Sequence, residues 1–285
     1  MLKRIVTSIV ALIVFIPILI FSDTWIFPAA MAFGSLAGCY EMLCCVGQKK
    51  NIWLAIPIYA VAVFMPLYIR YVHISGAQEP LFSFLKLAMG VIVLMALYVF
   101  GVAVYNNKNM SITDTSVVYS SCLYIIAAFT AIVYLRYYVA LGKYIYLLTF
   151  LCAWMTDSFA YFTGRLLGKH KLIPSVSPKK TVEGAIGGIV FCVLTVVVFG
   201  FVIDKFFDPS ESFRAMYIPL AISGIVVSVV SQTGDLIMSV IKRHYNIKDY
   251  GKIFPGHGGI LDRFDSVMAV SLVLAVICTY FNLFS

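Results

Sequence analysis

The densest gathering of chemically capable side chains lies near the C-terminus, in the 27-residue run SVIKRHYNIKDYGKIFPGHGGILDRFD from Ser239 to Asp265. It holds five cations, three carboxylates, two histidines and four glycines. The run lies between long apolar segments of a chain in which 12% of the residues are charged. Charges beside lipid are costly, so such a cluster indicates a functional site. Its mixture of cations, carboxylates and glycine-rich backbone suits a polyphosphate held with a divalent metal.

Asp235, just before this run, begins a pattern that would place polar side chains on one helical face. If the helix continues past Asp235, Ser239 follows at i+4, and Lys242 and Arg243 follow at i+7 and i+8. A carboxylate, a hydroxyl and cations on one face can hold a metal–phosphate complex. A salt-bridged helix end is the alternative interpretation, and the spacing alone does not decide between the two.

The glycine-rich stretch PGHGGILDRFD ends the run. Its glycines let the backbone approach an anion and expose N–H groups to it. Two carboxylates spaced three residues apart are predicted to share one face of the helix that follows, with an arginine between them. His257 either donates to a phosphate oxygen or ties the loop down, and both interpretations stay open. The candidate residues of this stretch are His257, Gly258, Gly259, Asp262, Arg263 and Asp265.

A second basic segment, SPKKTVEG, begins at Ser177. Ser177 is predicted to be a helix N-cap, with Pro178 at the first helical position. Lys179 and Lys180 would then lie at a helix N-terminus, where the dipole and free N–H groups favour anions. The alternative is an ordinary basic anchor for the apolar segment that follows. The pair Gly184 and Gly188 indicates close helix packing rather than chemistry.

Two carboxylates lie inside apolar segments. Asp157 precedes Tyr161 and Gly164 on roughly the same helical face, and a carboxylate at such depth should have a partner or line a polar cavity. Glu41 poses the same question, but no motif surrounds it. We therefore expect Glu41 to make a structural hydrogen bond or a lateral polar contact.

The composition indicates a membrane protein. The chain is 62% hydrophobic, with a mean hydropathy of +0.97, whereas soluble domains are typically about 45–50% apolar. Its apolar runs are continuous and at least about 17 residues long, which is the length needed to cross a bilayer as a helix. The predicted fold class is therefore all-α, a polytopic membrane protein with about nine transmembrane helices. The predicted spans are 5–21, 25–46, 52–71, 82–105, 117–136, 144–164, 184–203, 214–234 and 267–284.

The lysines and arginines predict the orientation. With the N-terminus in the cytosol, 15 of the 21 fall on the inner side, which favours an N-in, C-out topology in the cytoplasmic membrane. The charged loops 165–183 and 235–266 then face the cytosol. We divide the chain into N-terminal transmembrane helices, 1–140, and a catalytic transmembrane region, 141–285. The net charge of +8 suits anionic lipid and nucleotide phosphates, so no nucleic-acid partner is expected. The seven cysteines are expected to be buried apolar residues.

The charged run resembles the signature of the phosphatidate cytidylyltransferases, also called CDP-diacylglycerol synthases. That pattern is Ser, two residues, Lys-Arg, four residues, Lys-Asp, a short spacer, His-Gly-Gly and Asp-Arg-x-Asp. The stretches around Asp157, SPKKTVEG and SQTGD also look like the family, so the resemblance covers roughly residues 150–285. Every signature position is filled, by Ser239, Lys242, Arg243, Lys248, Asp249, His257, Gly258, Gly259, Asp262, Arg263 and Asp265.

The resemblance implies that CTP condenses with phosphatidic acid to give CDP-diacylglycerol and pyrophosphate. It also implies Mg²⁺, with Asp235 and Asp262 as metal carboxylates. From the chemistry of the residues, Asp265 or Asp249 would complete or orient that shell. A second cation, monovalent or divalent, stays open, as does a homodimer. The predicted catalytic residues are Asp235, Asp262, Lys180, Lys242 and Arg263. The predicted substrate-binding residues are Asp157, Ser177, Lys179, Ser239, Arg243, Lys248, His257, Gly258 and Gly259.

The chemistry of the residues agrees with this expectation. A phosphate monoester is largely ionised at neutral pH, so a lipid phosphate needs no strong general base to attack the α-phosphorus of CTP. The barrier lies in bringing anions together, which cations and metal ions lower. Two alternatives stay open: a CTP-dependent kinase of a polyprenol or other lipid alcohol, and an ion-coupled transporter. A transporter should concentrate polar residues near the midplane of several spans, whereas here they concentrate in two loops.

Overall fold

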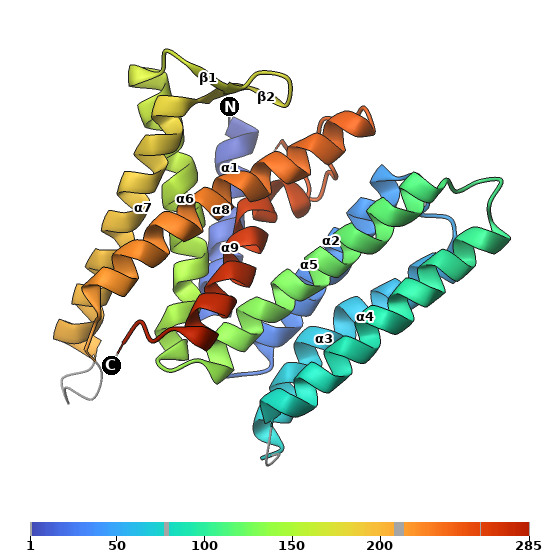
Figure 1. Ribbon diagram of the computed structural model, residues 1–285, viewed down its shortest axis with the longest axis horizontal. Helices are drawn as coiled ribbons and strands as arrows, with labels where there is room; N and C mark the ends of the chain where they lie inside the picture. Colours follow the sequence, from blue (N-terminus) through green and yellow to red (C-terminus); the bar gives the residue numbers. More distant parts are fainter. Residues whose placement is uncertain (1, 77–79, 208–213, 257, 285) are drawn as a thin grey trace. The chain divides into compact units, whose positions relative to one another are not determined.

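The computed structural model describes residues 2–76, 80–207, 214–256 and 258–284, which are mainly helical (Figure 1). This confirms the predicted all-α fold class. A short two-stranded hairpin and a π-helical turn, η1 (Ile203–Phe207), interrupt the helices. The helices of the described ranges are α1 (Leu2–Ile20), α2 (Ile26–Cys45), α3 (Ile52–Ile74), α4 (Pro80–Tyr105), α5 (Ile112–Tyr138), α6 (Gly142–Leu167), α7 (Val182–Val202), α8 (Tyr217–His244) and α9 (Leu261–Tyr280).

Seven stretches of the described residues are long and apolar enough to cross a membrane. Six of them lie in α2, α3, α4, α5, α6 and α8, and the seventh runs through α7 and η1 as Val182–Phe207. The chain is therefore a multi-helix membrane protein. Each predicted span falls on a helix, but α1 contributes only a shorter apolar stretch, Ile9–Ile20, and α9 is not among the seven. The count of nine transmembrane helices and the topology stay predictions.

The chain divides into two compact units. Unit 1 is Met1–Tyr137 with Tyr245–Arg263, and unit 2 is Tyr138–His244 with Phe264–Ser285. The segment Tyr245–Arg263 thus belongs with the N-terminal helices, although it follows α8 in the chain. The charged run is divided accordingly: its first part and Asp265 belong to unit 2, and its glycine-rich part belongs to unit 1.

Unit 1 contains α1 to α5 and is built on close helix packing. α3 packs against both α2 and α4. A glycine allows α2 to approach α5, since a Cβ at Gly34 would collide with the ring of Phe129. Phe27 and Phe129 are almost completely buried, as is Ile132. This packing places the C-terminal half of α2 beside the glycine-rich segment, because Gly38 lies against the side chain of Leu261.

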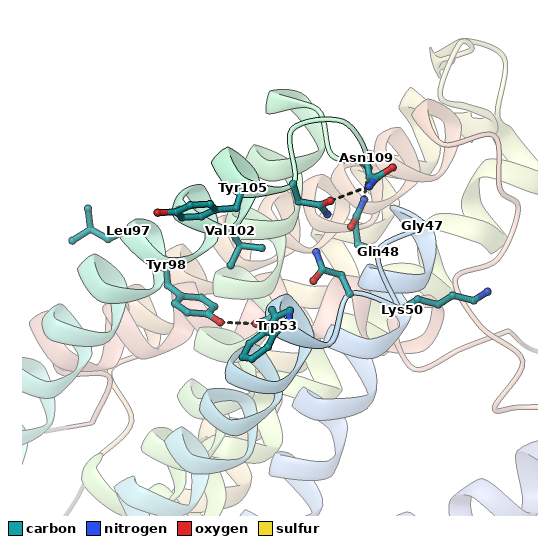
Figure 2. A pocket seen from close by; sticks show the side chains of 12 residues that line it. Gly47, Gln48, Lys50, Trp53, Leu97, Tyr98, Val102, Tyr105 and Asn109 are labelled. Atoms are coloured by element: carbon teal, nitrogen blue, oxygen red, sulfur yellow. Dashed lines mark hydrogen bonds between the residues drawn. The ribbon is translucent and has the colours of Figure 1, made fainter.

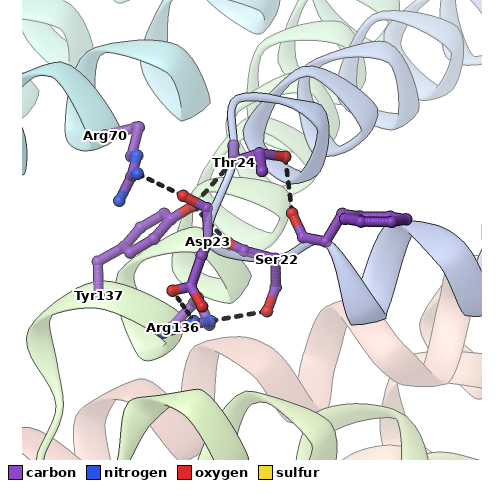
Figure 3. Close-up of polar contacts among 7 residues, drawn as sticks. Ser22, Asp23, Thr24, Arg70, Arg136 and Tyr137 are labelled. Carbon is purple, nitrogen blue, oxygen red and sulfur yellow. Dashed lines mark hydrogen bonds and ion pairs between the residues drawn. The ribbon is translucent and has the colours of Figure 1, made fainter.

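A polar network joins one end of α5 to the turn between α1 and α2 (Figure 3). Arg136 is buried; it donates to Ser22 Oγ at 2.9 Å and pairs with Asp23. The hydroxyl of Tyr137 donates to the carbonyl oxygen of Ser22 at 2.7 Å. The guanidinium of Arg70, from α3, lies 4.3 Å from the centre of the Tyr137 ring. These contacts connect α3, α5 and the turn between α1 and α2, outside all the sequence motifs.

Unit 2 is held by α7, which packs along both α6 and α8. Glycines permit the close approach to α6: a Cβ at Gly184 would lie 2.6 Å from the carbonyl oxygen of Ala160, and one at Gly188 would lie 3.0 Å from that of Thr156. The prediction that Gly184 and Gly188 serve helix packing is confirmed. The seven cysteines of the chain are free thiols. Four of them are buried, as expected, whereas Cys44, Cys45 and Cys278 are half-buried.

Candidate functional site

The segment SPKKT is a strand, so the prediction that Ser177 caps a helix is wrong. Ser177–Thr181 forms β2, which pairs antiparallel with β1 (Lys171–Ile173) and sets Ser177 opposite Ile173. Thr181 caps α7 instead, since its Oγ1 accepts a hydrogen bond from the Gly184 N–H at 3.1 Å. Thr181, four positions later, is also a favoured capping residue type.

The strand separates the two adjacent lysines, because successive side chains of a strand point to opposite faces. Lys180 is half-buried, and its Nζ lies 2.6 Å from Asp235 Oδ2. The same ammonium donates to the carbonyl oxygen of Gln232 at 3.4 Å. Lys179 is exposed. Of the two predicted phosphate ligands, only Lys180 is brought to a predicted metal carboxylate.

The polar face predicted from Asp235 onward is confirmed. α8 continues unbroken to His244, and Ser239 Oγ donates to Asp235 Oδ1 at 3.3 Å. Asp235 is therefore held on one oxygen by a hydroxyl and on the other by the Lys180 ammonium. Lys242 follows on this face and is half-buried, whereas Arg243 is exposed.

Three carboxylates of unit 2 act on one another. Ser266 Oγ donates to Asp157 Oδ2 at 3.0 Å, which supplies the partner expected for Asp157. Burial and the negative charges of Asp235 and Asp157 raise the pKa of Asp265 to about 8, although the Ser266 N–H and Lys242 oppose this rise. Negative charges that lie close together disfavour one another's ionisation, so a cation bound near these carboxylates would be stabilised.

The glycine-rich segment of unit 1 is organised around a buried carboxylate from α2. Glu41 is 2% exposed, and its two oxygens accept hydrogen bonds from the N–H groups of Ile260 and Leu261, both at 2.9 Å. The carboxylate fills the space beside two glycines, since a Cβ at Gly251 or Gly259 would collide with it. Glu41 thus holds the start of α9, and the expected structural hydrogen bond is confirmed.

Asp262 fixes the same segment from its other side. Its Oδ2 accepts hydrogen bonds from the N–H groups of Tyr250 at 2.8 Å and Gly259 at 3.0 Å. Gly258 has φ +92°, a conformation that favours glycine, and exchanges two backbone hydrogen bonds with Phe254. The predicted metal carboxylate Asp262 is therefore also a scaffold of the loop.

Sequence reasoning missed the contact that holds the start of this loop. The hydroxyl of Tyr245 donates to Asp114 Oδ1 at 2.8 Å. Burial and this carboxylate raise the pKa of the Tyr245 phenol. Asp114 is itself fixed by reciprocal hydrogen bonds with Ser111 at the start of α5. The signal available in the sequence was the Ser-x-x-Asp spacing of a capping box before an apolar segment.

The remaining predicted residues occupy accessible positions. Lys248, Asp249 and Arg263 are exposed, so their side chains are available to a soluble or interfacial ligand. His257 lies outside the described residues. Within the described ranges, no group of three or more His, Cys, Asp or Glu side chains is arranged to hold a metal ion.

Comparison with known proteins defines the class of this chain. Residues 2–281 match the cytidylyltransferase family, and the chain belongs to that family. It is 32% identical over 280 residues to the phosphatidate cytidylyltransferase of Bacillus subtilis, which covers 98% of each chain. It is also 32% identical over 276 residues to the phosphatidate cytidylyltransferase of Staphylococcus haemolyticus and 33% identical over 274 residues to that of Staphylococcus aureus, in each case covering 96% of this chain and 97% of the relative.

Proposed function

We propose that this protein transfers the cytidylyl group of CTP to phosphatidic acid, giving CDP-diacylglycerol and pyrophosphate. The observation that carries the proposal is the filled signature from Ser239 to Asp265 in a chain that the cytidylyltransferase family matches over residues 2–281. The relatives named phosphatidate cytidylyltransferase cover almost the whole of this chain, which supports the same activity.

The residues of the chain suit this reaction because it brings anions together. The lipid phosphate is already ionised when it attacks the α-phosphorus, so the chain has to supply positive charge and orientation rather than a strong base. Lys180, Lys242, Lys248 and Arg263 are each proposed, from their place in the motifs, as residues that bind phosphate oxygens. Lys180 is oriented by its contacts with Asp235 and the Gln232 carbonyl, so its ammonium is held in a defined place.

We also propose Mg²⁺ as the cofactor. The carboxylates of unit 2 supply the oxygen ligands that Mg²⁺ prefers, and a cation would relieve the repulsion that Asp235 and Asp157 exert on Asp265. Asp235 and Asp265 would hold the ion, and Asp262 is proposed as a further metal carboxylate. When bound, the ion would neutralise phosphate charge and polarise the reacting phosphoryl group. Because Asp235 contacts Lys180, the two side chains act as a pair.

The finer localisation belongs to the same proposal. The seven apolar stretches place the chain in a membrane, and the relatives are bacterial, which supports the cytoplasmic membrane. The lysine and arginine distribution favours the N-in, C-out orientation, with loops 165–183 and 235–266 facing the cytosol. This orientation gives the enzyme access to a soluble nucleotide on the side where its cations gather. A homodimer is compatible with the proposal.

Product analysis tests the activity. Purified protein is incubated with phosphatidic acid, Mg²⁺ and CTP labelled at either the α- or the γ-phosphorus. We expect the α-label in the lipid fraction and the γ-label in pyrophosphate. Transfer of the γ-label to a lipid alcohol would identify the kinase instead. Absence of turnover together with ion-coupled uptake into proteoliposomes would identify the transporter.

A magnesium titration of two variants tests the metal carboxylates. Asp235→Asn and Asp262→Asn are each expected to lower turnover on the order of 10³-fold or more, because a lost ligand removes several kcal/mol of transition-state stabilisation. A metal ligand should also raise the Mg²⁺ concentration needed for half-maximal rate. If Asp262→Asn lowers the rate with an unchanged magnesium requirement, Asp262 acts only as the loop scaffold described above. Near-normal turnover of Asp235→Asn at saturating Mg²⁺ would refute its assignment as a ligand.

A further inference from the structure

Unit 1 contains a cavity of about 850 Å³ that shares no residue with the signature or with SPKKTVEG (Figure 2). It is lined by the turn between α2 and α3, by the first turn of α3, and by the C-terminal part of α4 with the loop that follows. Its lining has a polar end and an apolar wall, which Figure 2 shows as the Gln48–Asn109 side and the Leu97–Tyr105 side.

The polar end is rich in amides and carries one charge. Four amide side chains, Gln48, Asn51, Asn106 and Asn109, line it together with Lys50. The lining contains no carboxylate, and among the described residues Lys50 has no acidic partner. This end of the cavity therefore favours an anion.

Asn51 provides an independent indication of a ligand. Its Oδ1 accepts a hydrogen bond from the Leu54 N–H at 3.3 Å and so caps α3. Its Nδ2 is buried and has no hydrogen-bond partner within the described part of the chain. A buried amide donor without a partner is costly. Asn51 lines the cavity, so a rotation of its amide toward the cavity would let an acceptor oxygen of a bound molecule satisfy this donor.

The apolar wall leads from this polar end onto a membrane-facing helix. Leu97 and Val102 of α4 line the wall, together with Trp53 and Tyr105, which are 79% and 95% exposed. Only 17% of the apolar stretch of α4 is buried within this chain, so most of that stretch is available to lipid. Tyr98 fixes the wall by donating from its hydroxyl to the Trp53 carbonyl oxygen at 2.7 Å. Exposed Trp and Tyr beside amides and a lysine are typical of the membrane–water interface.

We propose that this cavity binds a glycerophospholipid of single negative charge, at a site separate from the substrates. The phosphodiester would contact Lys50 and the Asn51 amide, and an acyl chain would lie along Leu97 and Val102. One lysine balances the single negative charge of a phosphodiester. CTP carries several negative charges and has no acyl chain that could pack against an aliphatic wall. The proposal rests on the cavity and does not depend on the proposed function.

Lipid titration of the purified full-length protein in detergent tests the site. Phosphatidylglycerol and phosphatidylcholine with identical acyl chains are compared by native mass spectrometry. We expect tighter binding of phosphatidylglycerol, weakened about fivefold in Lys50→Gln, since a lysine near anionic lipid contributes about that factor. Asn51→Asp should weaken it at least as much, because the aspartate still caps α3 but repels the phosphate. Lys49→Gln, a neighbouring cation outside the lining, should change binding less than twofold.

A photoactivatable phosphatidylglycerol locates the bound lipid. We expect cross-links within residues 47–53 and 97–109, lost on competition with phosphatidylglycerol but not with CTP. Equal binding of the two lipids, equal effects of Lys49→Gln and Lys50→Gln, or competition by CTP would each overturn the proposal. Thermal unfolding of each variant without added lipid checks that the substitutions leave the fold intact.

Discussion

Glu41→Gln is the sharpest test of how the glycine-rich loop is held. The substitution keeps the size of the side chain, so it opens no cavity. A carboxylate offers two acceptor oxygens, and both are used by the N–H groups of Ile260 and Leu261. A carboxamide offers one oxygen and an NH₂ group. One of the two backbone donors would therefore face another donor in a site where Glu41 is 2% exposed.

The cost follows from that lost acceptor. A buried donor left without a partner costs about 1–3 kcal/mol, and the surviving hydrogen bond loses the strength that the carboxylate charge gives it. Removing the charge also removes the cost of burying it, which offsets part of the loss. We therefore expect a net local destabilisation of about 1–3 kcal/mol at the start of α9.

Hydrogen exchange measures this directly. The amides of Ile260 and Leu261 should lose protection by about 5- to 150-fold in Glu41→Gln, while the amides of α6 stay unchanged. Turnover should fall with it, because the loop carries Lys248 and the first turn of α9 carries Arg263. Glu183→Gln is the control: Glu183 accepts the His170 N–H at 3.2 Å on the surface of unit 2 and should leave both amides unaffected. Unchanged exchange at Ile260 and Leu261 in Glu41→Gln would refute the argument.

Three further outcomes are expected. Lys180→Gln should reduce turnover about 10- to 150-fold, which is the effect of losing one charge-assisted contact. Lys179→Gln should reduce turnover far less. Equal small effects of the two substitutions in a CTP assay would reject Lys180 as a phosphate ligand. Arg136→Ala should destabilise unit 1 by about 1–3 kcal/mol, because it removes the hydrogen bonds to Ser22 and Asp23. Thermal unfolding measures this loss. Asp23→Asn should reduce the stability less, because Asp23 is 84% exposed. Cysteine-accessibility mapping should place 165–183 and 240–260 in the cytosol, and an external location of 240–260 would contradict both the topology and the use of cytosolic CTP.

The sequence was sufficient to predict the all-α membrane fold class and to identify the charged run from Ser239 to Asp265 as the candidate functional motif. Helical segments can be predicted because crossing a membrane requires a long uninterrupted apolar run, which is a local property of the chain. The helical face of Asp235 and Ser239 and the packing role of Gly184 could be predicted for the same reason, since residues three or four apart meet on any helix. The signature run is likewise visible without any knowledge of its surroundings.

Only the tertiary structure decided how these residues are used. The sequence did not distinguish Lys179 from Lys180; the pairing of β2 with β1 did, because a strand turns adjacent side chains to opposite faces and sends Lys180 to Asp235. The sequence predicted a structural hydrogen bond for Glu41 but not its partners, which lie 219 and 220 positions away. Contacts over such separations depend on which helices pack together, and local patterns of hydropathy and capping carry no information about that choice.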